Sequence, residues 1–266
     1  MKNLLLIAIT ILAVGCSGKD ESTTETKPVE AKVEEVKEEV KTEEPVVETK
    51  PKPEGVNAEE LEERESIRYF TDSETPYTGK VYGLYENGQK QFEGKMKDGK
   101  KDGLWIGWYE KGKKQFEVNW KDDKLDGPAL QWYENGQKQI EANYMDGNFI
   151  GLHVAWHENG QKKTEGNYKD GKRDGLSLEW YKKGQKMGEG NWKDGKEDGL
   201  ATIWYENGQK WAEVNWKDGK KEGIQLTWHE NRQKKAEVNW KNNIALSEKY
   251  WNSKGEPVDS EEEAEK

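Results

Sequence analysis

The sequence predicts an all-β protein, an elongated single-layer antiparallel sheet of tandem 24-residue β-hairpins. Three observations predict it. A segment close to Trp-Tyr-Glu-Asn-Gly-Gln-Lys recurs with a fixed 24-residue period and without an insertion. Asn-Gly or Asp-Gly pairs, which favour tight type I′ turns with positive φ at both residues, punctuate each repeat. Apolar and polar residues alternate between the turns, as expected for half-buried strands.

Composition supports a repeat protein and argues against ordinary globular packing. Only 32% of the 266 residues are hydrophobic and 36% are charged, which leaves too little aliphatic mass for a large core. The 13 Trp and 28 Gly, however, are not typical of a disordered chain. The predicted array, residues 67–258, holds 33 basic and 31 acidic side chains. This near-neutral balance predicts no nucleic-acid partner.

The N-terminus has the pattern of a secretory signal. Residues 1–15 combine Lys2 with an apolar stretch that is too short to span a bilayer. Cys16, the only cysteine of the chain, follows directly and excludes intramolecular disulfides. The segment Ala13-Val14-Gly15-Cys16 resembles the signal box of bacterial lipoproteins, with Ala13 where Leu is usual. The resemblance implies lipidation of Cys16 and a membrane anchor at the cell envelope. In an organism with two membranes, Ser17 after the cysteine favours the outer rather than the inner membrane.

Two segments outside the array are predicted to be disordered. Residues 16–66 form a charged, low-complexity linker that cannot bury enough apolar surface to offset chain entropy. The helical spacing of the valines from Val29 to Val40 leaves a transient helix in this linker as an alternative. Residues 57–66 are predicted to form a short helix that Asn57 caps. Residues 259–266 form an acidic tail.

Alternation assigns the aromatic residues of the array to faces. Leu104, Ile106 and Trp108 are expected to share one apolar face with Phe116 and the residues that alternate after it. Each Trp of a ladder is expected to pack against the next repeat, with stacking on a sugar or peptide as the alternative. Two further residues break the pattern on the opposite face, and they are the candidate binding residues: Trp105 and Trp211. The ladder comprises Trp108, Trp132, Trp156, Trp180, Trp204 and Trp228.

The 24-residue unit, with its Tyr-x-x-Gly spacing over residues 76–258, resembles the bacterial variant of the MORN repeat. That resemblance implies the hairpin sheet. The opening Thr75-Pro76-Tyr77-Thr78-Gly79-Lys80 is also similar to proteins that are grouped as YwqK-family antitoxins. This second resemblance implies a toxin as one candidate partner.

No catalytic constellation is predicted, and no cofactor or metal. His157 and His229 stand where other repeats have Tyr, so we interpret them as replacements for that ring. Asp residues in Lys-Asp-Gly-Lys are interpreted as turn formers, with a calcium site as the alternative. The sequence therefore predicts a membrane-anchored, non-catalytic module that binds or scaffolds a protein or glycan partner. An antitoxin or immunity lipoprotein is the alternative, and a passive spacer is a third possibility.

Overall fold

The computed structural model describes residues 53–265. The predicted signal peptide, Cys16 and most of the predicted linker lie outside this range. Within residues 53–265, no helix has the length and hydrophobicity needed to cross a bilayer.

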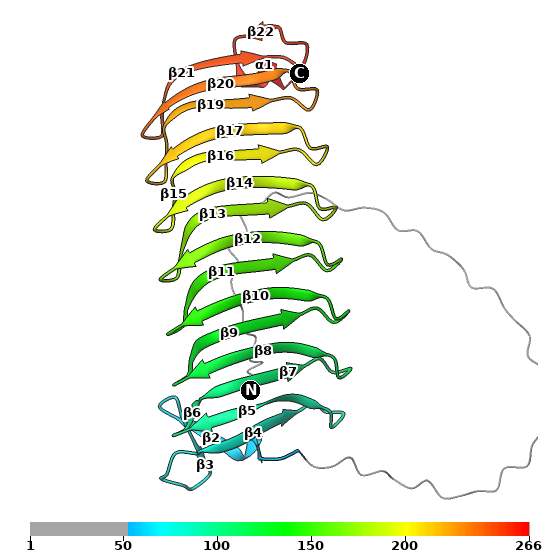
Figure 1. Ribbon diagram of the computed structural model, residues 1–266, viewed down its shortest axis with the longest axis vertical. Coiled ribbons are helices and arrows are strands. Elements are labelled where there is room, and N and C mark those ends of the chain that lie inside the picture. The colour runs from blue at the N-terminus through cyan, green and yellow to red at the C-terminus, as the bar shows by residue number, and fades with distance from the viewer. Residues whose placement is uncertain (1–52, 266) are drawn as a thin grey trace, which may run out of the picture. The chain divides into compact units, whose positions relative to one another are not determined.

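The predicted sheet is confirmed. Strands β4 to β22 follow one another in chain order with antiparallel pairing, and β1 (Val56–Asn57) pairs parallel to β4. The short strands β6, β15 and β18 do not pair with the strand that follows each of them; β6 and β7 both pair with β5, β15 and β16 with β14, and β18 and β19 with β17. Figure 1 shows the strands stacked along one axis of the array. The stacked strands are β4 (Gly79–Leu84), β5 (Lys90–Lys97), β6 (Lys100–Lys101), β7 (Gly103–Trp108), β8 (Lys114–Lys121), β9 (Lys124–Trp132), β10 (Lys138–Met145), β11 (Asn148–Trp156), β12 (Lys162–Lys169), β13 (Lys172–Trp180), β14 (Lys186–Lys193), β15 (Lys196–Glu197), β16 (Gly199–Trp204), β17 (Lys210–Lys217), β18 (Lys220–Lys221), β19 (Gly223–Trp228), β20 (Lys234–Lys241), β21 (Ile244–Trp251) and β22 (Pro257–Val258).

The Asp-Gly turns between repeats have the predicted type I′ conformation. In the first of them, Lys97 pairs with Lys100, which leaves two residues in the loop. Asp98 has φ 50° and Gly99 has φ 75°, so both central residues are left-handed. This backbone matches the twist of the flanking strands.

The Asn-Gly turns within repeats differ from the prediction. In the first, Gly88 has φ 76°, whereas Asn87 is not among the left-handed residues. The Gly88 amide donates to the Tyr85 carbonyl at 2.9 Å, as in a type I turn followed by a glycine bulge. The Asn87 side chain accepts from the Gln89 amide at 2.9 Å. The type I′ prediction was therefore wrong here, because this local bond keeps Asn87 right-handed and glycine alone turns the chain.

The bulge inverts the predicted face of one strand in each hairpin. Trp108 pairs with Lys114, but the next pair joins Gly107 to Phe116, so Gln115 is an extra residue. Without this extra residue, Phe116 would pair with Ile106 and share its face, as the alternation of apolar and polar residues predicted. A shift of one residue moves every later side chain of the strand to the other face. The predicted common apolar face was therefore wrong.

Two different faces result. We call the side that carries Trp105 and Val118 the packed face, because its central side chains are buried along the array. The opposite side, the exposed face, carries a line of Leu and Ile side chains, which Pro128 interrupts in the third repeat. These aliphatic residues are Leu104, Leu152, Leu176, Leu200 and Ile224, which are 44–47% exposed. In a sheet of one layer, the core is the packing between side chains of neighbouring strands.

The N-terminal end of the array begins earlier than the predicted boundary at residue 67. Asn57 caps a 3-10 helix, Ala58–Glu60, with a full capping box. The predicted helix over residues 57–66 stops there because β2 (Leu61–Arg64) pairs with β3 (Ile67–Phe70) in a separate two-stranded sheet. The C-terminal end of the predicted linker, from residue 53 to residue 66, thus belongs to the folded body.

The C-terminal tail is ordered up to residue 265, in contrast to the predicted disorder. Ser260 caps α1 (Glu261–Ala264), and Ala264 is fully buried. The helix contacts β20, β21 and β22. The acidic composition predicted disorder, but Ala264 is buried against the last strands and Glu265 forms an ion pair with Lys235, so the helix covers the end of the array.

Candidate functional site

The exposed face repeats one arrangement of Lys, Glu and Trp. The Lys138 ammonium lies 2.7 Å from a Glu141 carboxylate oxygen and 5.2 Å from the ring centroid of Trp156 in the next repeat. Each cation–π contact of this exposed kind contributes about 0.5–1 kcal/mol. Each ladder Trp therefore lies against a Lys of the preceding repeat, whereas the sequence predicted a contact with the next repeat. The ring contacts are Lys90 on Trp108, Lys114 on Trp132, Lys138 on Trp156, Lys162 on Trp180, Lys186 on Trp204, Lys210 on Trp228 and Lys234 on Trp251.

A second bond per repeat fixes the spacing of the ladder. The Tyr133 hydroxyl donates to the Trp156 carbonyl at 2.8 Å. His157 takes the same place in the next repeat, with Nε2 at 2.9 Å from the Trp180 carbonyl oxygen. His229 makes the equivalent contact to Trp251 at 2.9 Å. The interpretation of both histidines as replacements for Tyr is confirmed, and a structural bond explains them.

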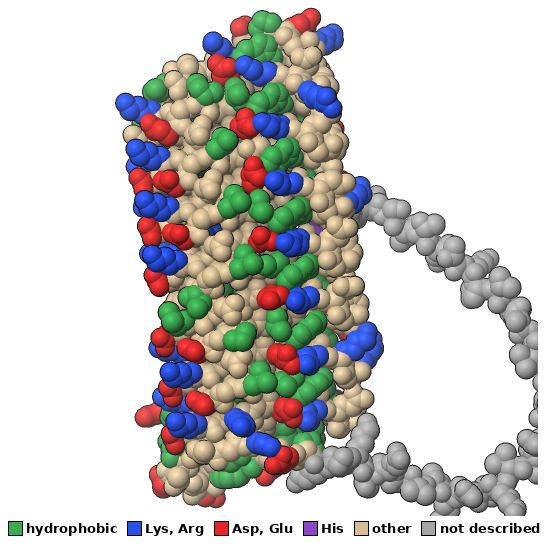
Figure 2. Space-filling view, in the orientation of Figure 1, with side chains coloured by type: hydrophobic (Ala, Val, Ile, Leu, Met, Phe, Trp, Pro, Cys, Tyr) green, Lys and Arg blue, Asp and Glu red, His purple; other side chains and the backbone are tan. Residues whose placement is uncertain are grey.

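The exposed face is a continuous surface of mixed character. Figure 2 shows hydrophobic side chains across this side of the array, with acidic and basic side chains beside them in each repeat. The aliphatic line of Leu104 and its equivalents runs parallel to the Trp ladder, and the Lys–Glu pairs lie on the intervening strands. Since each pair is neutral as a whole, the surface is apolar with local charge and has no strong net field.

Trp105 is a core residue, and its prediction as a binding residue was wrong. It is 6% exposed, and its ring stacks on Phe92 with centroids 5.6 Å apart. Its indole N–H donates to the Lys95 carbonyl at 3.0 Å. A Cβ at Gly94 would lie 2.3 Å from the ring, so glycine makes room for it. The bulge at Gln115 also explains this error. It turns Phe116 and Val118 to the side of the sheet that carries Trp105, so this side is the packed face.

Trp211 is much more exposed than Trp105. It is 39% exposed and occupies the bulge of β17, between the pairs Trp204–Lys210 and Ile203–Ala212. Its nearest ring is Tyr205, at 6.4 Å. The two candidate residues therefore do not form one site, and Trp211 alone remains available to a ligand.

A buried lysine on the packed face was missed by sequence reasoning. Lys101 is buried, with its ammonium 5.0 Å from the Trp105 ring and 4.4 Å from the Trp120 ring. Burial, and secondarily the Arg68 guanidinium, lowers the pKa of Lys101 to about 8. The sequence did indicate that Lys101 is buried, because the equivalent residues of the next two repeats are the apolar Leu125 and Phe149.

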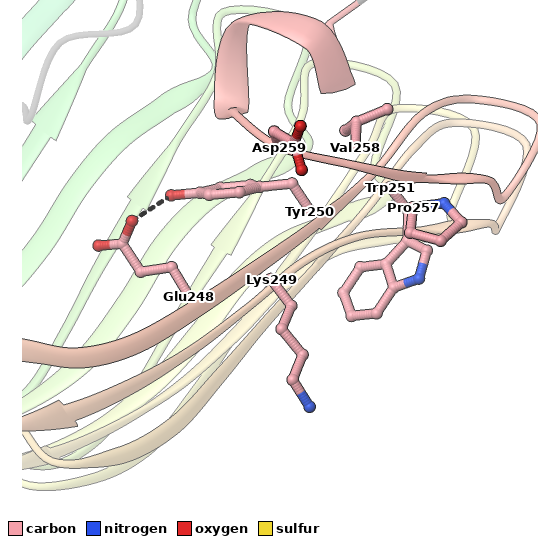
Figure 3. Close-up of a pocket in the computed structure, with 7 residues that line it drawn as sticks. All are labelled: Glu248, Lys249, Tyr250, Trp251, Pro257, Val258 and Asp259. Carbon is pink, nitrogen blue, oxygen red and sulfur yellow. Dashed lines mark hydrogen bonds between the residues drawn. The ribbon is translucent and has the colours of Figure 1, made fainter.

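The degenerate last repeat forms a shallow pocket at the C-terminal end. It has a volume of about 400 Å³ and is lined by Glu248 to Trp251 and Pro257 to Asp259. Figure 3 shows Tyr250 directed toward Glu248, and this hydroxyl donates to the carboxylate at 2.7 Å. That bond, with burial, raises the pKa of Tyr250 to about 12. The phenol therefore stays protonated and is not a nucleophile at neutral pH.

Metal chemistry has no visible site in the part of the chain that the structure describes. No three His, Cys, Asp or Glu side chains lie together there in a ligand arrangement. His153 lies on the packed face against Phe149, with ring centroids 5.2 Å apart. Burial, followed by the effect of Arg173, lowers the pKa of His153. It is therefore a neutral core residue at physiological pH.

Four segments of the chain match the model of the MORN repeat variant. These are residues 101–122, 125–146, 150–170 and 197–218. Each of these segments is similar to the MORN repeat variant. Each one covers a first strand, the Asn-Gly-type turn and the second strand, so the MORN unit coincides with the hairpin of the structure. Among curated proteins, no relative matches the chain.

Proposed function

We propose that the MORN array is a non-catalytic binding or scaffolding module that presents its exposed face to a protein partner at the cell envelope. The observation that carries this proposal is the aliphatic line beside the Trp ladder, which repeats along the array and is nearly half exposed. Contiguous exposed apolar surface of this kind marks interaction sites in soluble proteins. The Tyr and His bonds between repeats keep the spacing of this surface regular.

The anchor belongs to the same proposal. Lipidation of Cys16 would attach the chain to the membrane, most simply the outer membrane in an organism that has two. Residues 17–52 would then separate the array from the lipid surface. The acyl chains would supply the membrane affinity, since a near-neutral array offers little attraction to anionic lipid.

The test is capture of envelope proteins by the mature chain and by two variants. The first carries Leu152→Gln, Leu176→Gln and Leu200→Gln on the exposed face. Each lost aliphatic contact is expected to cost roughly 1 kcal/mol of binding, so the three together should weaken binding by about 100-fold. These side chains are nearly half exposed, so the fold should be retained, as circular dichroism would show.

The matched control replaces three exposed turn lysines, Lys169, Lys193 and Lys217, with serine. It should capture the same partner as the wild type. Equal capture by the leucine variant and the wild type would contradict the proposal. A toxin as the captured protein, with loss of its toxicity, would assign the antitoxin role instead of a scaffold.

A further inference from the structure

The last long strand of the array has an outer side that is open over most of its length. β21 pairs with β20 on its inner side, from Ile244 to Tyr250. On its outer side, β22 pairs only with Tyr250 and Trp251. Among the described strands, none pairs with the outer side of residues 244–249, and Figure 1 shows β22 beside only one end of β21. We call residues 244–249 the open edge.

The open edge is more apolar than the same segment of earlier repeats. Ile244 is 65% exposed and Leu246 is 58% exposed, the highest values among the large hydrophobic residues of the described chain. Natural proteins usually protect an edge strand with charged side chains, above all Lys. Here the charges are missing where the sheet ends. Ile244 stands where the three preceding repeats have Lys172, Lys196 and Lys220, and Leu246 stands where they have Asp174, Asp198 and Glu222.

The fold explains the loss of the acid but not the gain of apolar side chains. In the preceding repeat, a Glu222 carboxylate oxygen accepts from the Asn242 amide, which lies in the next turn between repeats, at 3.0 Å. No such turn follows Leu246 in the described chain, so an acid has no equivalent role there. Ile244 and Leu246 nevertheless remain largely in solvent, so packing within the chain does not account for them.

The backbone of the open edge offers hydrogen-bonding groups to a further strand. Just after β21, the Asn252 amide donates to the Glu256 carbonyl at 2.9 Å, on the outer side. Since alternate amides of a strand point to the same side, the amides of Tyr250 and Glu248 also point outward. Glu248 has no strand partner there. An extended peptide along the edge would pair with such groups, the recognition mode known as β-strand addition.

The charge of the adjoining pocket indicates which peptide fits. Glu248 and Asp259 line this pocket, and the acidic helix α1 follows directly. Figure 3 shows Lys249 directed away from both carboxylates. This side of the edge is therefore acidic and favours a Lys or Arg side chain. The chain's own residues 17–52 fit it poorly, because they carry 11 acidic and 7 basic side chains.

We propose that the open edge of β21 binds an extended, basic segment of a partner protein, which joins the sheet as one further strand. Its backbone pairs with outward groups such as the Glu248 amide. Its apolar side chains pack on Ile244 and Leu246, and a Lys or Arg lies against Glu248 and Asp259. This site lies at the end of the array and does not rest on the aliphatic line of the exposed face.

The test is fluorescence polarisation of labelled peptides titrated with the full chain at physiological salt. One probe is a short peptide of alternating Val and Lys, and the other is a peptide of alternating Val and Glu of the same length. We expect saturable binding of the Val-Lys peptide. The Val-Glu peptide should bind about tenfold more weakly or less, because it places carboxylates against Glu248 and Asp259.

Three variants locate the site. Ile244→Lys combined with Leu246→Asp restores the charges of most earlier repeats and leaves the net charge unchanged. Glu248→Pro removes an outward amide, a change that edge strands tolerate, whereas Glu248→Gln removes only the charge. We expect the double variant and Glu248→Pro to weaken binding by about tenfold, and Glu248→Gln to have a smaller effect. Leu176→Gln on the exposed face is the control and should bind like the wild type.

Thermal unfolding of each variant shows whether the fold is retained, and we expect melting temperatures close to that of the wild type. The absence of saturable binding of the Val-Lys peptide to the wild-type chain would overturn the proposal. Unchanged affinity in both the double variant and Glu248→Pro, or equal affinity for the two peptides, would also overturn it. A dimer of the wild-type chain that the double variant abolishes would assign the open edge to a second copy instead of a basic partner.

Discussion

Replacing Trp105 with alanine is expected to lower the free energy of unfolding by about 3–5 kcal/mol, the range for large-to-small changes at buried aromatic sites. The indole is buried, stacks on Phe92 and fills the space over Gly94. Its loss leaves a cavity and removes one of the two hydrogen bonds that the Lys95 carbonyl accepts, so that only the bond from the Asp102 amide remains. Because repeats unfold partly independently, hydrogen exchange of the amides in β5 to β8 is the appropriate measurement.

Trp211→Ala is the matched control for this prediction. It removes the same side chain from a site that is 39% exposed. Its effect on unfolding should stay within about 1 kcal/mol. If both variants lost similar stability, the assignment of Trp105 to the core would be wrong. A capture experiment with Trp105→Ala would confuse loss of structure with loss of binding, so Trp105 is unsuitable for mapping a ligand.

Lys101→Met is expected to stabilise the array at neutral pH by about 2 kcal/mol, since apolar replacements of buried charges are often stabilising on this scale. The wild-type chain must hold a buried ammonium whose pKa is lowered to about 8, whereas the unfolded chain has the ordinary value near 10.5. This pKa difference means that folding disfavours the charged form of Lys101, relative to its neutral form, by about 3 kcal/mol. The stabilisation by Met is expected to be smaller, because other changes at the site offset part of it. Met fits because Leu125 and Phe149 fill the equivalent place in the next repeats.

The same pKa shift predicts the pH dependence. Below about pH 8, Lys101 is protonated in both states, so its contribution to stability is constant and at its lowest. Between about pH 8 and 10.5 only the unfolded chain binds the proton, so wild-type stability should increase with pH. This increase should be absent in Lys101→Met. Denaturant unfolding at pH 7, 8, 9 and 10 measures it, with Lys121→Met at an exposed site to correct for the removal of one charge. An equal rise in Lys101→Met would contradict the account.

The repeat itself was predictable because its signals are local. Glycine and Asp in the turns fix the hairpin boundaries, and a period without insertions fixes how the hairpins stack. The assignment of faces was not predictable in the same way. It depends on one extra residue, Gln115 in the second repeat, and sequence alternation does not show whether a turn adds a bulge.

The candidate sites show the same limit. Trp105 and Trp211 both break the repeat pattern, but only pairing across strands shows that one is core and the other exposed. The ordered tail depends on contacts of Ala264 with strands that are formed by earlier residues, and its own acidic sequence carries no sign of them.

Thiol labelling of adjacent residues tests the assignment of faces most directly. The chain with Cys16→Ser has no other cysteine, so single cysteines can be placed at Leu176 and Ser177, or at Pro128 and Ala129. The account predicts rapid modification at positions 176 and 128, which are exposed, and slow modification at positions 177 and 129, which are buried. Equal rates within each pair, or faster reaction at positions 177 and 129, would contradict the exposed face on which the proposed partner binds.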